Sequence, residues 1–310
     1  MESLLIVPSA SETEWLHELL PELSPIALPI AGRRFFDYAL ESAQRLGFVR
    51  VGVLDWHYSE DIAAGISDVS NRGIPCIYQR GTGPVPHGLD ELEKIPSPFT
   101  NPVRDGLTVV WGICLTSHRL ETVSYEPISA EECVETPVGI YCRRAGQWLR
   151  IRPHGLAVRD IKSWYRLNSA VLENSWLFTL PGYSAEKDVH LGRNVVIEHG
   201  TNVKPPVILQ DDTWCARNVH LDGDVVVGQR SFIGEGAHLS RTIVGDDTYV
   251  GIGLELVDKI VVGHRIIDVH TGTWTDVEEP GLAGTIGGVG LGWLRKLWSF
   301  LTGTSRGRRG

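Results

Sequence analysis

The sequence lacks several features that mark common functional classes. Its five cysteines include no CxxC and no paired spacing, which argues against a zinc knuckle or a disulfide framework and is typical of a reducing compartment. Basic residues number 29 against 38 acidic ones, and a net charge of −9 argues against nucleic acid, because binding to phosphates needs a basic surface. The N-terminus has no signal-peptide pattern, and no stretch reaches the ~18 apolar residues of a membrane-spanning helix. We therefore expect a cytoplasmic protein that binds no nucleic acid.

Glycine is missing from the start of the chain and abundant later. No glycine precedes Gly32, whereas the whole chain holds 34, concentrated toward the C-terminal half. A chain of 310 residues is long enough for two domains, each with its own core. The uneven distribution of glycine indicates that the two halves have different architectures.

The N-terminal half has the order of a strand–helix–strand unit. Leu4 to Val7 and Val49 to Leu54 are apolar strands, and Phe35 to Leu46 has helical spacing that Gly47 ends. This order predicts a parallel sheet with a binding crevice at the carboxyl ends of its strands. Further strands are expected at Leu107 to Val110 and at Val138 to Cys142.

Four segments of this half resemble the family of sugar-1-phosphate nucleotidyltransferases. They are PIAGRRFFDYALESAQRLGFVRVGVL, VVWGICL, VGIYC and VRDIKSWYRLNSAVL, which occur in the family's order. The resemblance implies an α/β nucleotidyltransferase-like (Rossmann-like) domain over residues 1–178 that binds a sugar phosphate or nucleotide sugar. It also implies that Gly32 and Arg33 contact the substrate and that Asp160 is a Mg²⁺ ligand. A solvated helix start is an equally open interpretation of Arg33 and Arg34.

The sequence departs from that family at its catalytic motifs. The family's glycine-rich loop after the first strand, whose backbone N–H groups hold the nucleotide phosphates, is replaced by PSASETE at residues 8–14. The lysine expected before PIAG is absent, and Ile113 and Cys114 stand where the family has a metal-binding Asp. Without these groups, attack on a nucleoside triphosphate lacks electrostatic support. We expect a domain that has lost nucleotidyl transfer.

The C-terminal half repeats every six residues. Aliphatic residues or cysteine recur every six residues. Each is preceded two positions earlier by a small, β-branched or aliphatic residue, and glycine often follows. This pattern predicts a parallel β-helix whose aliphatic side chains point inward, with three hexads to a coil. The pattern resembles the left-handed β-helix of hexapeptide transferases over residues 179–280. The inward positions are Leu191, Ile197, Val203, Leu209, Cys215, Leu221, Val227, Ile233 and Leu239 and, after a one-residue skip, Val244, Val250, Leu256 and Val262.

One outward column carries the polar residues Asn202, His220 and His238 at a spacing of three hexads, joined after the skip by Glu255. In hexapeptide acyltransferases an outward His acts as general base beside acyl-CoA. The resemblance therefore implies that His220 or His238 is catalytic, with Asn202 and Glu255 as substrate contacts and Glu255 or Asp222 as orienting partner. A polar ladder or a subunit contact is the alternative, since such helices commonly form trimers.

Two further surfaces are expected in the second half. Trp214 and Phe232 form another column, predicted to be exposed and to contact another subunit or domain. Residues 281–292 form a predicted glycine-rich linker, and residues 293–310 (WLRKLWSFLTGTSRGRRG) combine an apolar face with a basic end. This tail predicts either peripheral contact with anionic lipid at the inner face of the membrane or docking on the protein itself.

Three functional hypotheses follow. The first is a degenerate nucleotidyltransferase of cell-surface polysaccharide biosynthesis that binds a sugar phosphate or nucleotide sugar, or acts as a scaffold. The second is an acyltransferase acting on a sugar or nucleotide sugar through the histidine column. The third is an active nucleotidyltransferase with an atypical phosphate loop.

Overall fold

The computed structural model divides the chain into two compact units. Unit 1 comprises Met1–Thr179 and unit 2 comprises Leu180–Gly310. The two units are described separately. The residues that the structure describes are 3–9, 13–21, 23–57, 59–70, 73–99, 106–115, 124–152, 156–174, 178–279 and 281–286.

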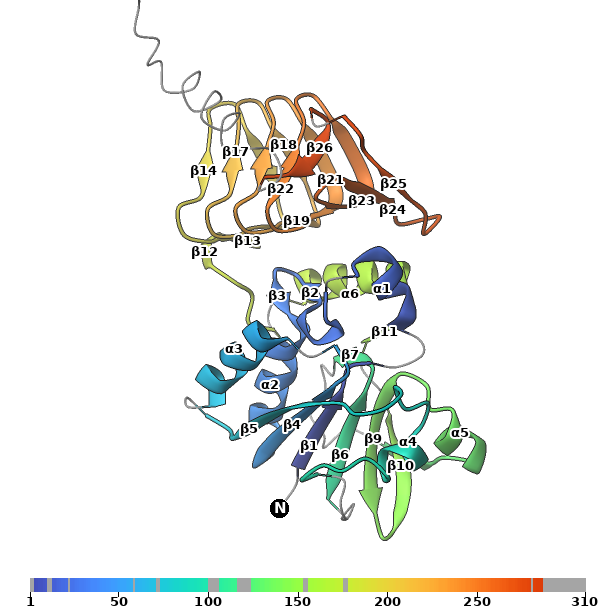
Figure 1. Ribbon diagram of the computed structural model, residues 1–310. Helices are drawn as coiled ribbons and strands as arrows, with labels where there is room; N and C mark the ends of the chain where they lie inside the picture. Colours follow the sequence, from blue (N-terminus) through green and yellow to red (C-terminus); the bar gives the residue numbers. More distant parts are fainter. Residues whose placement is uncertain are drawn as a thin grey trace, which may run out of the picture. The chain divides into compact units, whose positions relative to one another are not determined.

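Unit 1 is built on a seven-stranded mixed sheet in the order β5-β4-β1-β6-β9-β10-β8 (Figure 1). The first four strands are parallel and the last three antiparallel. From β1 the chain goes first to β4 and β5 on one side and later to β6 on the other, so the strand order reverses between β1 and β6. The expected parallel sheet is therefore confirmed. The strands are β1 Ser3–Val7, β4 Arg50–Asp55, β5 Cys76–Arg80, β6 Leu107–Trp111, β8 Ser124–Pro127, β9 Gly139–Arg144 and β10 Gln147–Arg152.

The PIAG stretch is a tight hairpin that leads into a helix. Strands β2 (Pro29–Ile30) and β3 (Arg33–Arg34) pair antiparallel, and Ala31 and Gly32 between them both have positive φ, as a two-residue hairpin turn requires. The backbone N–H of Ala31 donates to Oδ1 of buried Asn168 at 2.6 Å, which holds this strained residue. Helix α2 (Phe35–Arg45) follows and ends before Gly47, whose φ is +77°.

The remaining helices of unit 1 are short, apart from α3 and α6. They are α1 Glu14–Leu19, η2 Pro25–Ala27, α3 Glu60–Ser70, α4 Leu89–Leu92, α5 Ala130–Val134 and α6 Ile161–Glu173. A further antiparallel pair joins β7 (Ile113–Leu115) to β11 (Leu156–Val158). No helix among the described residues is both long and apolar enough to cross a membrane.

Unit 2 consists of short strands stacked in parallel register. Val189 pairs with Val207 and Val207 with Val225, a step of three hexads, and the same step joins Trp214 to Phe232. The predicted stacking of residues three hexads apart is thus confirmed. The strands are β12 Tyr183–Glu186, β13 Val189–Leu191, β14 Val196–Ile197, β15 Asn202–Lys204, β16 Val207–Leu209, β17 Trp214–Cys215, β18 His220–Asp222, β19 Val225–Val227, β20 Phe232–Ile233, β21 His238–Val244, β22 Thr248–Val250, β23 Glu255–Val262, β24 Arg265–Asp268, β25 Trp274–Asp276 and β26 Ala283–Thr285.

The six-residue count is wrong at its last position. Val227 pairs with Val244 and Val244 with Val261, each step one residue short of three hexads, so a second residue is skipped beyond the one that the sequence revealed. Val261 is fully buried in the core of unit 2, whereas Val262 is only partly buried. Both shorter steps occur at the same corner of unit 2. Arg241 and Asp258, which stack on each other at this corner, both have positive φ.

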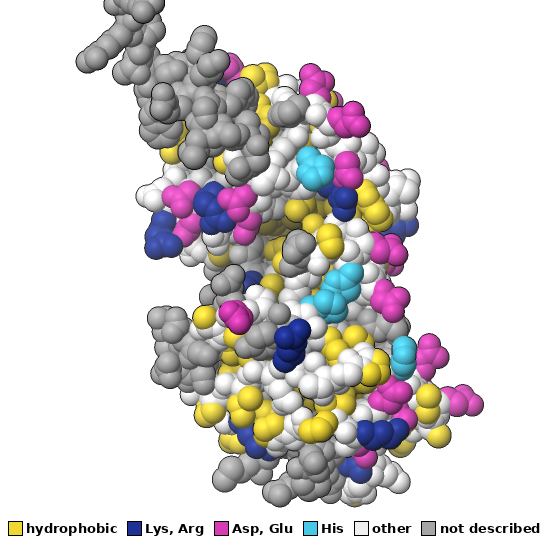
Figure 2. Space-filling model, in the orientation of Figure 1, with side chains coloured by type: hydrophobic (Ala, Val, Ile, Leu, Met, Phe, Trp, Pro, Cys, Tyr) yellow, Lys and Arg dark blue, Asp and Glu magenta, His cyan; other side chains and the backbone are white. Residues whose placement is uncertain are grey.

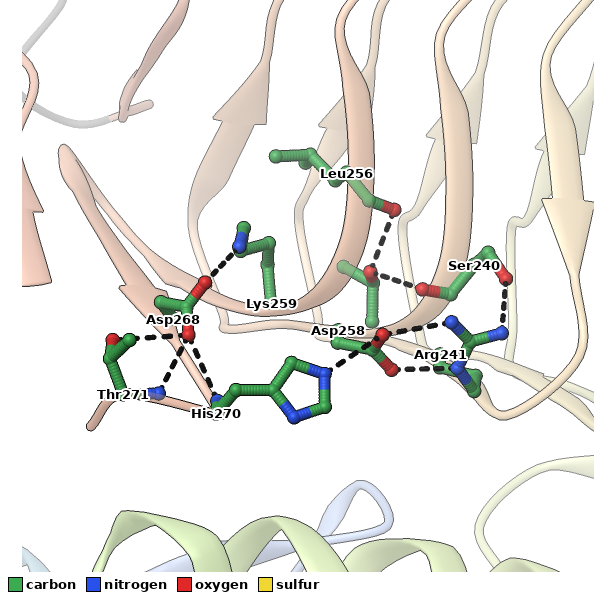
Figure 3. Close-up of polar contacts among 9 residues, drawn as sticks. Ser240, Arg241, Leu256, Asp258, Lys259, Asp268, His270 and Thr271 are labelled. Carbon is green, nitrogen blue, oxygen red and sulfur yellow. Dashed lines mark hydrogen bonds and ion pairs between the residues drawn. The ribbon is translucent and has the colours of Figure 1, made fainter. Parts of the chain in front are cut away.

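Ion pairs join this corner to the closing strands (Figure 3). Asp258 accepts hydrogen bonds from Nε and Nη2 of Arg241 at 2.6 and 2.8 Å, and Nε2 of His270 lies 3.2 Å from its carboxylate. The contacts with Arg241, and then with His270, hold the pKa of Asp258 below its usual value despite partial burial. Asp268 pairs with Lys259 and accepts from the backbone of Thr271. On the displayed face of the molecule, Lys and Arg side chains lie beside Asp and Glu (Figure 2).

Two other expectations for unit 2 need correction. Trp214 and Phe232 are half-buried rather than exposed, because Phe232 stacks on Tyr249 of the next coil and Nε1 of Trp214 donates to Glu198 at 2.9 Å.

The predicted linker 281–292 contains strand β26, which pairs antiparallel with β22 and adds buried Ala283 to the core. Residues 287–292 of that linker and the predicted amphipathic tail 293–310 lie outside the described residues.

The corrected register gives a direct test of the core. Val261→Ala removes two buried methyl groups and should cost roughly 1–3 kcal/mol of stability, whereas Val262→Ala should cost less than about 0.5 kcal/mol. Calorimetric melting of the two variants measures the difference in the transition of unit 2. Equal shifts, or a larger shift for Val262→Ala, would support the uninterrupted six-residue count instead.

Candidate functional site

The predicted substrate contacts of unit 1 lie on the PIAG hairpin, where Arg33 is already engaged. Its Nη1 lies 2.9 Å from Oε2 of Glu41 and also donates to the backbone oxygen of Thr179. The guanidinium lies over the ring of Tyr38, 4.8 Å from its centroid. Gly32 provides the positive φ of the turn. The structure therefore gives Arg33 a role within unit 1, and a ligand would have to compete with Glu41 for it.

The carboxyl edge of the parallel strands holds polar residues that sequence reasoning missed. Asp55, the last residue of β4, is fully buried and accepts three hydrogen bonds. Oγ of Ser24 donates to its Oδ2 at 2.7 Å, the hydroxyl of Tyr78 donates to the same oxygen at 2.9 Å, and the backbone N–H of His57 donates to Oδ1 at 2.9 Å. We call Ser9, His17, Ser24, Asp55, His57 and Tyr78 the edge cluster.

Two histidines of the edge cluster, His17 and His57, stack on each other. The rings of His17 and His57 stack with centroids 3.7 Å apart, and Nδ1 of His57 lies 3.2 Å from Oγ of buried Ser9. Burial, followed by the neighbouring charge of His57, lowers the pKa of His17. Burial therefore favours the neutral form of the His17 ring. Ser9 lies two residues after the end of β1, at the place where the sequence lacks a glycine-rich loop.

A sequence signal for part of this cluster existed. Asp55 and His57 come directly after an expected strand, and ligand-binding residues of parallel sheets gather at strand carboxyl ends. Ser24 and Tyr78 gave no such signal, because they lie 31 and 23 residues from Asp55. Their approach depends on how α1, η2 and β5 pack.

The expected Mg²⁺ ligand Asp160 serves as a helix cap. It is the N-cap of α6, and its Oδ1 accepts from the backbone N–H and from Oγ of Ser163, both at 2.7 Å. Partial burial opposes the effect of these bonds, which nevertheless lower the pKa of Asp160. Ile113 and Cys114 are buried in β7, and burial raises the pKa of the Cys114 thiol to about 12. Across the described residues, no group of three or more His, Cys, Asp or Glu side chains could hold a metal ion.

The predicted column of unit 2 is assembled as expected. Asn202 pairs with His220, His220 with His238, and His238 with Glu255, on strands β15, β18, β21 and β23. The rings of His220 and His238 meet edge to face, with centroids 5.9 Å apart. Asn202, His220 and Glu255 are exposed and His238 is half-buried, so the column faces outward.

Asp222 distinguishes the two histidines. Nε2 of His238 lies 2.9 Å from Oδ2 of Asp222, whose Oδ1 lies 3.1 Å from Nζ of Lys204. Partial burial would raise the pKa of Asp222, but the bonds from Lys204 and His238 hold it below its usual value. Because a carboxylate only accepts, Nε2 of His238 must donate to Asp222, and Nδ1, which lies 3.9 Å from Oε1 of Glu255, is the nitrogen that can accept a proton. Within the described residues, no ion pair involves His220.

Comparisons with known proteins give a distant and partial similarity. The chain is 32% identical over 113 residues to Bifunctional protein GlmU of Paraburkholderia phymatum, covering 32% of this chain and 22% of that protein. It is 31% identical over 117 residues to Bifunctional protein GlmU of Burkholderia vietnamiensis, covering 33% and 23%. The match spans less than a quarter of the length of these relatives. No protein-family model matches the chain.

The edge cluster predicts that Asp55 contributes more to the stability of unit 1 than Asp160 does. Asp55→Asn replaces an acceptor with an amide beside the hydroxyls of Ser24 and Tyr78, and should cost roughly 1–3 kcal/mol. Asp160→Asn makes the same change at an exposed N-cap, where Asn serves nearly as well, and should cost less than about 0.5 kcal/mol. Urea unfolding followed by helical circular dichroism measures both, because the helices within the described residues all belong to unit 1. Equal costs would mean that Asp55 is not a structural centre of the edge cluster.

Proposed function

We propose that this chain is a sugar nucleotidyltransferase-like protein that binds a sugar phosphate or nucleotide sugar without transferring a nucleotidyl group. We place it in cell-surface polysaccharide biosynthesis, as a binding or scaffold protein. The observation that carries the loss of nucleotidyl transfer is the edge cluster, and the binding role rests on the PIAG hairpin with Gly32 and Arg33. A carboxyl group that accepts three internal hydrogen bonds stands at the sheet edge where the family binds phosphates.

Electrostatics support the loss of transfer chemistry. Polyphosphate binding requires close backbone N–H groups, hence glycine, together with cations or Mg²⁺. No glycine precedes Gly32, and Ser9 after β1 is buried against His57. The residues of unit 1 do not fit the expected Mg²⁺ site, because Asp160 caps α6 and buried Ile113 and Cys114 stand in place of the second ligand. We therefore assign no step to a metal.

The second unit and the comparisons support membership in the same family. We infer that unit 2 is a left-handed parallel β-helix of hexapeptide repeats, because three short strands recur in each step of three hexads. We also infer that it forms a homotrimer, as such helices commonly do. The partial similarity to proteins named bifunctional agrees with a chain that joins two functional units. Membrane contact through residues 293–310 stays a prediction.

Two measurements on the full chain test the proposal. Nucleoside triphosphate plus sugar 1-phosphate and Mg²⁺ should release no pyrophosphate above the uncatalysed rate. A nucleotide sugar such as UDP-glucose should still shift the amide NMR signals of Gly32 and Arg33. Arg33→Ala should weaken this binding about five- to tenfold, because the hairpin loses the one of its two arginines that is expected to contact the substrate.

The outcomes separate the hypotheses. Arg45→Ala, which removes an exposed cation at the far end of α2, is the control and should bind as the natural chain does. Sustained pyrophosphate release would establish the active nucleotidyltransferase and refute the proposal. Absence of both release and binding would leave the scaffold role and refute the binding role.

A second candidate function is acyl transfer at the outward column, and the Asp222–His238 pair favours it. A neutral imidazole oriented by a carboxylate is the arrangement of a general base. His238 would take the proton from an acceptor hydroxyl or amine as that acceptor attacks the thioester carbon of acyl-CoA. The C–S bond then breaks, and the CoA thiolate leaves with the proton that His238 returns. Of the two predicted catalytic histidines, the geometry supports His238, with Asp222 rather than Glu255 as its orienting partner.

Acetyl transfer from acetyl-CoA to an amino-sugar phosphate tests this candidate. His238→Ala should lower turnover at least ~100-fold, the usual loss for a general base. Asp222→Asn should lower it about tenfold and displace the acidic limb of the pH profile, while His220→Ala should change it less than His238→Ala. No binding at millimolar acetyl-CoA, or equal losses from both histidines, would contradict this assignment.

A further inference from the structure

One outward face of unit 2 carries large apolar side chains instead of polar ones. It belongs to the sheet β14-β17-β20-β22-β26, in which Val196 pairs with Trp214, Trp214 with Phe232, and Phe232 with Tyr249. The ring centroids of Trp214 and Phe232 are 6.2 Å apart, and those of Phe232 and Tyr249 are 5.7 Å apart. The histidine column, by contrast, has only polar residues at the outward positions of its strands.

Exposed aliphatic side chains extend this surface at both ends. Val196 is 40% exposed in the first coil, and Ile252 and Leu282 are 72% and 42% exposed just beyond the end of β22. Ile252 and Leu282 are neighbours there, because the backbone N–H of Gly251 donates to the backbone oxygen of Leu282 at 2.7 Å. We call Val196, Trp214, Phe232, Ile252 and Leu282 the apolar band.

The apolar band concentrates the exposed apolar side chains of unit 2. Large apolar side chains that adjoin one another on a surface mark a site of association. A second apolar column, Ile208, Val226 and Ile243, is already buried and is not a free surface. Six large apolar residues are exposed among the described residues of unit 2, and four of them lie on or beside the sheet of the band. These four are Val196, Ile197, Ile252 and Leu282.

The chain itself carries an apolar segment that begins next to the band. Strand β26 lies beside β22 (Figure 1), and the backbone N–H of Ile286, directly after β26, donates to the backbone oxygen of Asp247 at 2.7 Å. From there, residues 287–292 can span about 20 Å when extended. Crossing from β26 to β14 takes four strand spacings, or about 19 Å. A segment that begins at residue 293 can therefore reach every part of the band.

The sequence of that segment is amphipathic. In a helix over residues 293–301, which is about 13 Å long, the apolar side chains lie on one face and Arg295 and Lys296 lie at its two edges. Such a face matches a flat apolar surface of a few strands. The apolar positions are Trp293, Leu294, Leu297, Trp298 and Leu301.

The charges around the band are opposite to those of the tail. Residues 180–286 contain 16 acidic and 8 basic side chains, whereas residues 287–310 contain five basic and no acidic ones. Exposed Glu235 and Glu279 lie beside the band, since their backbone oxygens accept from the N–H groups of Gly253 and Leu282. Neither carboxylate forms an ion pair within the part of the chain that the structure describes. They are suitable partners for the cations at the edges of the segment.

We propose that the apolar band is the docking site of residues 293–301 of the same chain. The apolar face of the segment covers Trp214 and Phe232, and its cations lie beside Glu235 and Glu279. Docking removes the same apolar face from lipid, so the membrane contact expected from the sequence requires the segment to leave the band. The inference is independent of the ligand proposed for unit 1.

Limited digestion of the full chain with chymotrypsin tests the docking, with cleavage after Trp293 and Trp298 followed by mass spectrometry. Docking buries these side chains, so cleavage waits for the segment to leave the band. Ile252→Lys removes an apolar contact and adds a charge that repels the basic segment. It should speed this cleavage about fivefold. Tyr183→Lys, the same kind of change at an exposed side chain outside the band, is the matched control and should leave the rate unchanged.

The acidic partners are tested in the same assay. Glu235→Gln combined with Glu279→Gln should speed cleavage about twofold at low salt and by less at high salt, because exposed ion pairs are weak and screened. An equal effect at both salt concentrations would contradict their pairing with the segment.

Three results would overturn the docking itself. The first is an equal cleavage rate in the natural chain and in Ile252→Lys. The second is a rate that falls as the protein concentration rises, which would assign the segment to a second copy of the chain. The third is protection that appears only with vesicles of phosphatidylcholine and phosphatidylserine, which would assign the segment to the membrane surface.

Discussion

The narrow interior of unit 2 is the constraint on which that unit depends. Aliphatic side chains such as Leu209, Leu221 and Ile233 fill it and are fully buried. Most of the strands around this interior are only two or three residues long, and the chain turns after each of them. The corners use residues in the left-handed region, including Asp188, Asn194, Asp212 and Asn218. Corner side chains bond from coil to coil, as Asn194 does with Asp212 at 2.9 Å.

The same constraint places the outward side chains in columns. On the surface of unit 2, each residue lies beside the residue one full coil earlier or later in the chain. The inward residues fix this register, so it does not depend on which side chains point outward. His238 meets Asp222 for this reason, since the two lie on neighbouring strands of one outward face. Outward chemistry can therefore vary without cost to the core.

Periodicity predicted this register and its first one-residue skip but not the second. Val261 and Val262 are adjacent valines, so the sequence could not reveal which one points inward once a coil is shorter by a residue. The glycine-rich composition of residues 281–292 likewise gave no indication of strand β26. This strand forms by antiparallel pairing with β22, and the backbone N–H of Gly251 donates to the backbone oxygen of Leu282 beside it. In unit 1, β1, β4, β6, β9 and α2 follow from local patterns, whereas the other strands were not predicted. The contacts of Asp55 with Ser24 and Tyr78 join distant segments and depend on tertiary packing.

The two candidate sites differ in what their carboxylates leave free. Asp55 is fully buried and has both oxygens occupied by internal donors, so it can stabilise the sheet edge but offers little to a ligand. Asp222 lies at the surface, where its bond to Nε2 of His238 leaves Nδ1 of the same ring available to accept a proton. A carboxylate used for folding and one that orients a base are thus distinguished by burial and partner type. On this physical ground, any transfer chemistry in the chain is expected at His238 rather than at the edge of the unit 1 sheet.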